Sequence, residues 1–359
     1  MMKYLTAIVT SSLLCVVAAC GQSPVTQPSA AQTTSPSPNS DQTQAAATRP
    51  AQAQRPVADP SKFAIIISGI GGEEAYAKQF AKWSSDLRDA LTNKLGFAED
   101  HVMLLCEKPS DGDLQATAAE VRRVFTQLKT ATAPDNSVFI FFIGHGSFDS
   151  KEAKFNLIGP DIAVTEYAQL IKALPARRVV VINTASASGE FIKPLSGAGR
   201  VVVTATRSGM EQNATRFAEY FISALSNAEA DTDKNSRISV LEAYDYASKL
   251  TAQFYEEQKR LATEHPLLDD NGDGTGHPKA EAGDGKLAQA TFFDSLLLQQ
   301  AGGDEELKKL FTERSELEAQ VEQLKGRKDQ MKAEEYEAEL EKLLIKLAEL
   351  NQKIQAKQK

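Results

Sequence analysis

The segment Ser137–Ile143, with the sequence SVFIFFI, constrains the fold of this 359-residue chain more than any other. Its uninterrupted apolar run is typical of a strand buried on both faces, as in the parallel sheet of an α/β fold. The run leads directly into Gly144, His145 and Gly146. Open α/β sheets bind ligands at the carboxyl ends of their strands, so His145 is a candidate general acid/base. The alternative is a loop histidine whose neighbouring glycines serve only the turn.

Apolar runs of the same kind recur along the chain and alternate with amphipathic segments. Strands are predicted at 63–70, 101–106, 137–143, 178–182 and 200–205, and helices at 73–95, 116–130 and 163–174. This alternation predicts βαβ units, and therefore an α/β fold with a mostly parallel sheet covered by helices on both faces. Cys106 lies among apolar neighbours and is predicted to be a core residue.

The first twenty residues have the features of an export signal. Lys3 precedes a short apolar segment from Leu5 to Val17, and the following Val17-Ala-Ala-Cys20 resembles the bacterial lipobox. This resemblance implies cleavage before Cys20, its acylation, and export to the cell envelope. The residues after Cys20 lack the aspartate that retains such proteins on the inner membrane, which indicates the outer membrane, facing the periplasm. An ordinary secretory signal with an incidental cysteine is the alternative.

Residues 21–59 are rich in Gln, Ser, Thr, Ala and Pro, a composition that cannot bury a core. We therefore predict a disordered linker between the signal and the folded domain. The net charge of −8 argues against nucleic acid as a partner. Two of the three cysteines fall in the signal segment, so no disulfide framework is predicted.

A second small-residue loop, Ala185–Gly189, follows the predicted strand at 178–182. Parallel strands end at the same edge of a sheet, so His145 is expected near Ser186 or Ser188. A histidine beside a hydroxyl is the geometry of nucleophilic catalysis. The alternative is that serine and alanine merely suit a tight turn.

The two loops together resemble the caspase-fold cysteine peptidases, in particular the legumain-like group, over residues 62–230. In that group an apolar strand runs into His-Gly, and a later one runs into Ala-Cys-x-Ser-Gly. The resemblance implies a three-layer, caspase-like α/β sandwich over residues 60–300. It also implies that His145 matches the catalytic histidine, and that Ser186 occupies the position of the catalytic cysteine.

The serine changes the expected chemistry. A hydroxyl is much harder to ionise than a thiol and needs a base in direct contact, whereas the histidine of this family faces the substrate from the other side of the scissile bond. We therefore expect a membrane-anchored peptidase homologue with impaired or altered catalysis that binds a peptide or protein. One alternative is a Ser-dependent hydrolase, with Ser186 as nucleophile, His145 as acid/base and Gly146 as an oxyanion donor. Another is a calcium-stabilised scaffold of the envelope, so enzymatic activity stays an open question.

Residues 231–242 resemble the twelve-position EF-hand loop, between helices predicted at 216–228 and 240–261. The matching ligands are Asp231, Asp233, Asn235, the Arg237 carbonyl, Ser239 and Glu242. Oxygen ligands with a terminal bidentate glutamate predict a calcium site, although Ser236 replaces the usual glycine. A capping box between Ser239 and Glu242 is a compatible alternative.

A second acidic loop carries Asp269, Asn271 and Asp273 at alternate positions. It lacks the terminal glutamate, so we predict a weaker metal site or an Asn-Gly/Asp-Gly turn.

The last segment, residues 303–359, is charged and strongly helix-forming. Its leucines recur at spacings of three, four and seven, as between Leu310, Leu317 and Leu324. This pattern predicts a coiled coil, or a helical hairpin that folds back at 326–334, with a coiled-coil partner. A solvated helix without a partner is the alternative.

Overall fold

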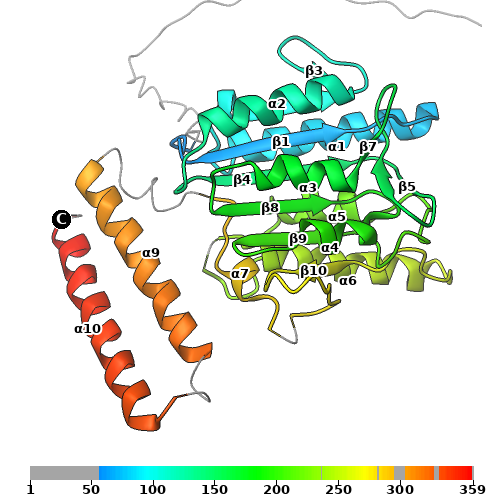
Figure 1. The fold of residues 1–359 in the computed structure, drawn as a ribbon. Coiled ribbons are helices and arrows are strands. Elements are labelled where there is room, and N and C mark those ends of the chain that lie inside the picture. Colours follow the sequence, from blue (N-terminus) through cyan, green and yellow to red (C-terminus); the bar gives the residue numbers. More distant parts are fainter. Residues whose placement is uncertain (1–55, 236, 281–282, 295–303, 327–330, 358–359) are drawn as a thin grey trace, which may run out of the picture. The chain divides into compact units, whose positions relative to one another are not determined.

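The computed structural model of the chain describes residues 56–235, 237–280, 283–294, 304–326 and 331–357. Its α/β domain has three layers, in which a seven-stranded sheet lies between two layers of helices (Figure 1). The predicted α/β architecture with a mostly parallel sheet is confirmed. The predicted signal segment 1–20 with Cys20, and residues 21–55 of the predicted linker, lie outside the described residues.

The main sheet has the strand order β10-β9-β8-β4-β1-β2-β3, and every neighbouring pair is parallel except β9 and β10. The central strand β4 pairs with β1 on one side and with β8 on the other. The strands span β1 (Lys62–Ser68), β2 (Val102–Cys106), β3 (Leu114–Gln115), β4 (Ser137–Ile143), β8 (Arg178–Asn183), β9 (Arg200–Thr204) and β10 (Leu267–Asp269).

Alternate side chains of β4 enter the cores on the two faces of the sheet, which explains its continuous apolar run. Phe139 and Phe141 pack with α1, α5, α6 and α7, whereas Ile140 and Phe142 pack with α2, α3 and α4. The helices span α1 (Glu74–Asn93), α2 (Ala118–Ala131), α3 (Val164–Lys172), α4 (Ile192–Leu195), α5 (Phe217–Ala224), α6 (Val240–Glu257) and α7 (Lys286–Gln289). Cys106 lies in the first of these cores, as predicted, with its side chain buried.

The predicted helices exist, but several are shorter than expected. The helix predicted at 240–261 ends at Glu257, just before Lys259, whose φ of 52° cannot continue a helix. The helix predicted at 216–228 ends at Ala224. The flanking helices of the acidic loop at 231–242 are therefore of unequal length. Six residues, 225–230, separate the end of α5 from Asp231.

A small antiparallel sheet follows His145 directly. It consists of β5 (Gly146–Phe148), β6 (Ala153–Phe155) and β7 (Ile162–Ala163) in the order β5-β6-β7. Strands of two or three residues are too short for a hydrophobic period, so the sequence did not indicate this sheet. It fixes the direction in which the chain leaves β4, and so the position of the loop that carries His145.

The last segment of the domain, Thr291–Asp294, joins the start of β1 to the residues that begin α6. The Lys62 ammonium donates to the carbonyls of Phe292 (3.3 Å), Phe293 (2.9 Å) and Asp294. Burial lowers the pKa of Lys62 to about 8, against the opposing charges of Asp59 and Asp294. The amide of Val240 donates to the Thr291 carbonyl at 2.8 Å. This segment is therefore hydrogen-bonded both to β1 and to the start of α6, and in this sense it closes the domain.

The two helices of the tail, α9 (Glu305–Gly326) and α10 (Ala333–Lys357), pack against each other as an antiparallel hairpin. The Lys357 ammonium lies 3.5 Å from the Asp304 carboxylate, which brings the end of α10 to the start of α9. Within the described ranges, no helix combines the length and the apolar character needed to cross a membrane.

Candidate functional site

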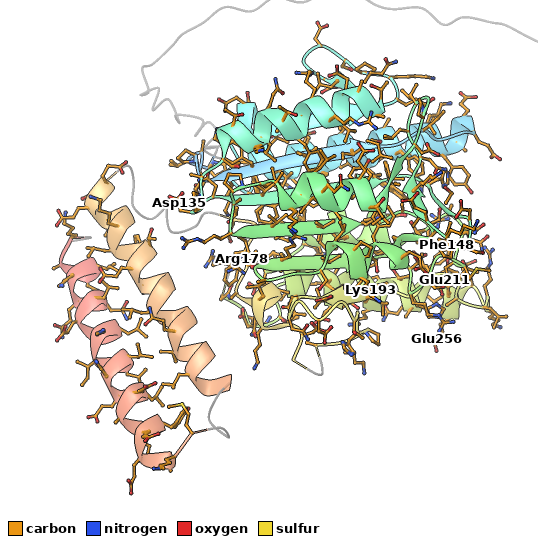
Figure 2. The ribbon with its side chains drawn as sticks, in the orientation of Figure 1. Asp135, Phe148, Arg178, Lys193, Glu211 and Glu256 are labelled. Atoms are coloured by element: carbon orange, nitrogen blue, oxygen red, sulfur yellow. The ribbon has the colours of Figure 1, made fainter. Side chains whose placement is uncertain are left out.

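The two loops singled out in the sequence lie side by side because their strands are neighbours in the sheet. Phe142 of β4 pairs with Asn183 of β8, and the two strands are parallel. The Thr184 hydroxyl donates to the Phe142 carbonyl at 2.7 Å, which continues the contact beyond the strand ends. Figure 2 shows Phe148 and Glu211 at this end of the domain, and Asp135 and Arg178 at the opposite end. The loops of His145 and Ser186 therefore meet at one edge, as predicted.

The Ser186 side chain is hydrogen-bonded to the backbone of Gly146. Its hydroxyl donates to the Gly146 carbonyl and accepts from the Gly146 amide, both at 3.1 Å. Its exposed fraction is 1%. A Cβ atom on Gly146 would lie 2.4 Å from the Ser186 carbonyl, so only glycine permits this approach. The amide predicted as an oxyanion donor is thus occupied by the hydroxyl predicted as the nucleophile.

His145 is positioned from the other side, by helix α1. Its ring lies edge-on to Tyr76 and Phe80, with ring centroids 4.9 and 5.0 Å away. Burial lowers the pKa of His145, whereas a hydrogen bond with the Gly71 backbone and the charge of Glu73 oppose this effect. The neutral form of the ring is therefore favoured. Among the hydrogen bonds of the described residues, none joins the His145 ring to Ser186.

Ser188, the other predicted candidate, has a structural role. Its fully buried hydroxyl accepts from the amides of Ala205 and Thr206, both at 3.1 Å, and so ties this loop to the end of β9. Ala187 between the two serines has a left-handed backbone, with φ of 54°. This turn sends the two hydroxyls to different neighbours, β5 and β9.

A third loop, Arg207–Gln212, borders the same edge. The amide of Ala187 donates to the Glu211 carbonyl at 2.7 Å. The Glu211 carboxylate accepts from the Arg207 amide at 2.9 Å and lies 2.5 Å from Nδ1 of His265. Sequence reasoning missed Glu211, since no motif surrounds it and 54 residues separate it from His265. Met210 at the tip of this loop is 73% exposed.

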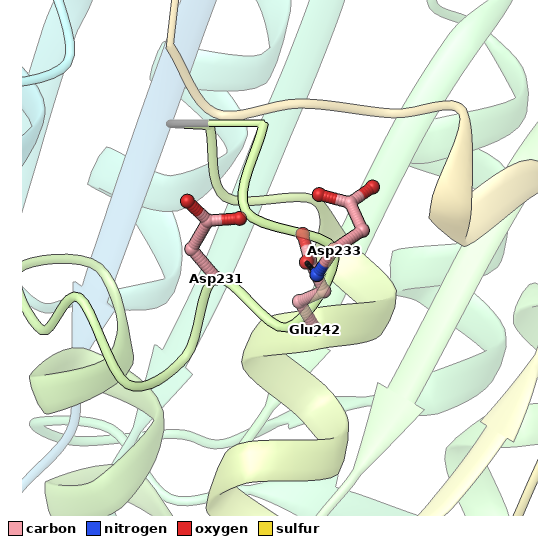
Figure 3. A group of neighbouring side chains, drawn as sticks. All are labelled: Asp231, Asp233 and Glu242. Carbon is pink, nitrogen blue, oxygen red and sulfur yellow. Dashed lines mark hydrogen bonds between the residues drawn. The ribbon is translucent and has the colours of Figure 1, made fainter.

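The acidic loop before α6 brings three carboxylates together. Asp231, Asp233 and Glu242 each offer an oxygen, and the three atoms lie within 4.8 Å of one another (Figure 3). Glu242 is buried, and its two oxygens accept from the amides of Thr232 and Ser239, both at 2.9 Å. This group of acidic residues could hold a metal ion. The capping box between Ser239 and Glu242 is present as well, so the two predicted roles coincide at Glu242.

The side chains of Asn235 and Ser239, two further predicted ligands of this loop, have partners within the protein. The Asn235 side-chain oxygen accepts from the Arg237 amide at 2.8 Å, and its side-chain nitrogen donates to Asp233. The Ser239 hydroxyl lies 2.8 Å from a Glu242 oxygen. The Arg237 guanidinium bonds to Asp294 at 2.8 Å and stacks on Phe292, with 3.7 Å from its central carbon to the ring centroid. The loop is thereby attached to the segment that closes the domain.

The second acidic loop is organised around backbone amides. The carboxylate of Asp269 accepts from Gly272 (3.1 Å) and Gly274 (3.0 Å), which gives the turn expected from the Asn-Gly and Asp-Gly pairs. Asn271 and Asp273 are both exposed, and the Asn271 oxygen accepts from the Asp273 amide at 2.8 Å. The loop geometry is accounted for by these hydrogen bonds.

Comparison with known proteins finds a distant structural likeness. The sequence matches no protein-family model and no curated protein. Among solved structures, this chain is similar to the protein GSU0716 from Geobacter sulfurreducens. The matched region is 58% of this chain and 93% of the GSU0716 chain. Its sequence identity is 11% and its TM-score is 0.38. At this level the likeness carries no inference about the site.

Proposed function

We propose that the protein is a caspase- or legumain-like peptidase homologue that does not cleave peptides and instead binds an extended protein segment. The observation that carries the first half is the double hydrogen bond between the Ser186 hydroxyl and the Gly146 backbone. A nucleophile must be accessible and must transfer its proton to a base. Ser186 is buried, and its proton is directed at a carbonyl instead of at His145.

The histidine is also poorly arranged for this proton transfer. Its ring is held by Tyr76 and Phe80 on the α1 side. A thiolate could act without direct contact to the histidine, because it is already ionised in part near neutral pH. A serine hydroxyl cannot, so replacing cysteine by serine removes the nucleophile while leaving the surrounding loops in place.

Binding at this edge is supported by a surface that we call the strand-end surface, formed by the exposed residues Ser147, Arg207 and Met210. The loop that carries the last two is held rigidly, since Glu190 accepts from the Gly209 amide at 3.0 Å and Glu211 accepts from the Arg207 amide. A rigid loop that presents an apolar side chain loses little entropy on binding. An exposed methionine is also a flexible contact for an apolar partner residue.

The catalytic part of the proposal is tested with a serine-reactive fluorophosphonate probe and a peptide library. We expect no labelling and no cleavage by the wild type, because the Ser186 hydroxyl is buried and lacks a base. Ser147→Ala is the matched control for an exposed serine of the neighbouring strand. Labelling of the wild type that disappears in both Ser186→Ala and His145→Ala would establish a Ser-dependent hydrolase instead. Peptidase activity gained by Ser186→Cys would support the family relationship.

The binding part is tested by selecting peptides on the immobilised protein and measuring their affinity by fluorescence polarisation. Met210→Glu is expected to weaken binding roughly tenfold or more, as burial of one apolar side chain predicts. Val57→Glu, an exposed apolar residue before β1, is the control and should leave the affinity unchanged. Equal affinities for both variants would exclude the strand-end surface as the binding site.

We further propose that the metal ion of the loop at 231–242 is calcium. Three carboxylates within 4.8 Å form a concentrated negative charge that a divalent cation would neutralise. Hard oxygen ligands in a flexible arrangement suit calcium better than magnesium, which demands an octahedral shell.

Calcium titration by calorimetry should give saturable heat for the wild type and at least tenfold weaker binding for Glu242→Gln. Glutamine can still form the capping box, so this variant should keep its α6 cap and its fold. Asp135→Asn, at an exposed aspartate outside both acidic loops, is the matched control and should bind like the wild type. Identical heats for the wild type and Glu242→Gln would refute a calcium site at this loop.

The remaining sequence features concern where the protein is located and what its tail binds. We propose that acylated Cys20 anchors the protein to the outer membrane, that the linker holds the domain in the periplasm, and that the tail joins a helical partner. The lipobox-like Val17-Ala-Ala-Cys20 and the leucine spacing of the tail support these assignments.

A further inference from the structure

A surface pocket with a volume of about 390 Å³ lies at the end of the domain opposite the loops of His145 and Ser186. It is formed by the end of α3, by α4 with the residues that follow it, and by the start of β9. Arg200, the first residue of β9, pairs with Val179, the neighbour of Arg178, which Figure 2 labels at this end. The volume is within the range of small-molecule sites, about 300–1,000 Å³. A ligand bound here would not contact the strand-end surface.

The charged side chains of this pocket are all positive. We call it the β9 pocket, and its polar lining consists of Gln169, Lys172, Ser196 and Arg200, with no acidic residue. Among the described residues, Lys172 takes part in no ion pair. The Arg200 guanidinium has a single hydrogen-bond partner there, the Leu195 carbonyl at 2.9 Å. The pocket therefore carries two positive charges that no described carboxylate balances.

The Arg200 side chain is held in place although its charge is not matched. It is half-buried, and burial lowers the pKa of the guanidinium without an opposing carboxylate. A Cβ atom on Gly197 would lie 3.7 Å from Cδ, Nε and Cζ of Arg200, so the guanidinium packs over the backbone of this glycine. Arginine is seldom buried without a partner, because a desolvated charge is costly unless it is paired. An anion in the pocket would offset this cost.

The groove between α1 and α5 shows the contrast. It is larger, at about 1120 Å³, and its lining mixes basic with acidic residues. Three of its cations have carboxylate partners: Lys78 pairs with Glu74, Lys82 with Asp86, and Arg216 with Glu219. Within the part of the chain that the structure describes, neither cation of the β9 pocket has such a partner. The β9 pocket is thus the better candidate for an anionic ligand.

We propose that the β9 pocket binds a small phosphate monoester, with its phosphate group on Arg200 and Lys172. Two cations match the charge of such a group, about −1.5 to −2 near neutral pH, whereas a carboxylate would leave one cation unmatched. The planar guanidinium suits two phosphate oxygens at once, and the ammonium adds a point charge. Ala168, Pro194 and Ala198 supply an apolar lining for the organic part of the ligand. The phosphate can belong to a soluble molecule or to a lipid headgroup.

The test is calorimetric titration of the full chain with inorganic phosphate, glycerol 3-phosphate and acetate at constant ionic strength. We expect saturable heat from both phosphate probes, and at least tenfold weaker binding of acetate. Arg200→Met and Lys172→Gln should each weaken phosphate binding tenfold or more. Lys249→Gln, at an exposed lysine of α6 outside the pocket, is the matched control and should bind like the wild type. Equal affinities of the wild type and Arg200→Met would overturn the site.

Thermal unfolding separates loss of the ligand from loss of the fold. Phosphate should raise the unfolding midpoint of the wild type, because it binds only the folded chain, and should leave that of Arg200→Met unchanged. Without phosphate the two midpoints should be similar, since the variant loses one hydrogen bond together with an unmatched charge. A midpoint that rises equally in both proteins would show a general salt effect and contradict the proposal.

The source of the phosphate is tested with vesicles of phosphatidic acid, compared with vesicles of phosphatidylcholine. Arg200→Met has the same amino-terminal segment as the wild type, so a difference between the two proteins in co-sedimentation reports the pocket alone. Weaker co-sedimentation of Arg200→Met with phosphatidic acid only would assign a lipid headgroup. Heat from glycerol 3-phosphate without such a difference would assign a soluble ligand. Absence of both would overturn the phosphate site.

Discussion

Gly146→Ala is expected to destabilise the protein by about 1–3 kcal/mol, the typical cost of overpacking a well-packed site. The added Cβ would lie 2.4 Å from the Ser186 carbonyl and 3.2 Å from that of Lys154. Both neighbours are backbone atoms, which cannot rotate away as the end of a flexible side chain would. The strand-end loops of β4 and β8 would have to separate, and the double hydrogen bond of Ser186 would be lost. Chemical denaturation measures the effect.

The control for this prediction is Gly197→Ala. Gly197 has no strained backbone angle, and an added Cβ there meets only the Arg200 side chain, at 3.7 Å. Its replacement should leave stability unchanged or raise it by about 0.4–1 kcal/mol through the unfolded chain. Ser186→Ala should cost less than Gly146→Ala, since it loses the same two hydrogen bonds without creating a clash. Equal stability of Gly146→Ala and the wild type would contradict the close contact of the two loops.

Phe293→Ala is expected to destabilise the protein by about 3–5 kcal/mol, the usual range for removing a buried phenylalanine. The ring is fully buried, with centroids 5.3 Å from Phe139 and 6.1 Å from Phe221. The resulting cavity would lie between the central strand β4 and helix α5. The adjacent carbonyls that accept from Lys62 would also lose their fixed position. Denaturation midpoints at constant m-value give the change in the free energy of unfolding.

Phe292→Ala tests whether this loss depends on burial. Phe292 is only partly buried and contributes its ring to the Arg237 contact, so its removal should cost about 1 kcal/mol, typical of a point substitution. The amide of Phe293 donates to the Ile238 carbonyl at 3.1 Å, next to the proposed calcium ligands. We therefore expect Phe293→Ala to weaken calcium binding as well. If Phe292→Ala were the more damaging variant, the conclusion that the buried Phe293 ring stabilises this end of the domain would be wrong.

The sequence predicted the main elements of the fold because their signals are local. The apolar runs of β1, β4, β8 and β9 reflect burial on both faces, and each is long enough for its pattern to be recognised. The short strands β5, β6, β7 and β10 have no such pattern. They form because tertiary neighbours complete their hydrogen bonds, so only the folded chain reveals them.

The candidate site was likewise predictable only in part from the sequence. The sequence placed His145 and Ser186 on adjacent loops, since parallel neighbouring strands end at one edge. It did not show where the hydroxyl and the ring point. That depends on Tyr76 and Phe80 from α1, on the approach permitted by Gly146, and on the left-handed turn at Ala187. Glu211 and His265 belong to the edge only through contacts between distant segments.

By itself, then, the sequence determined which segments form strands and helices, which residues follow the strands, and which acidic residues gather in the loop before α6. These properties depend on residue spacing within one segment. The tertiary structure alone decided that Ser186 bonds to Gly146 instead of to His145, that Thr291–Asp294 closes the domain on Lys62, and that Lys172 and Arg200 line one pocket. Such outcomes depend on distances between side chains far apart along the chain, which are fixed only when the whole chain packs.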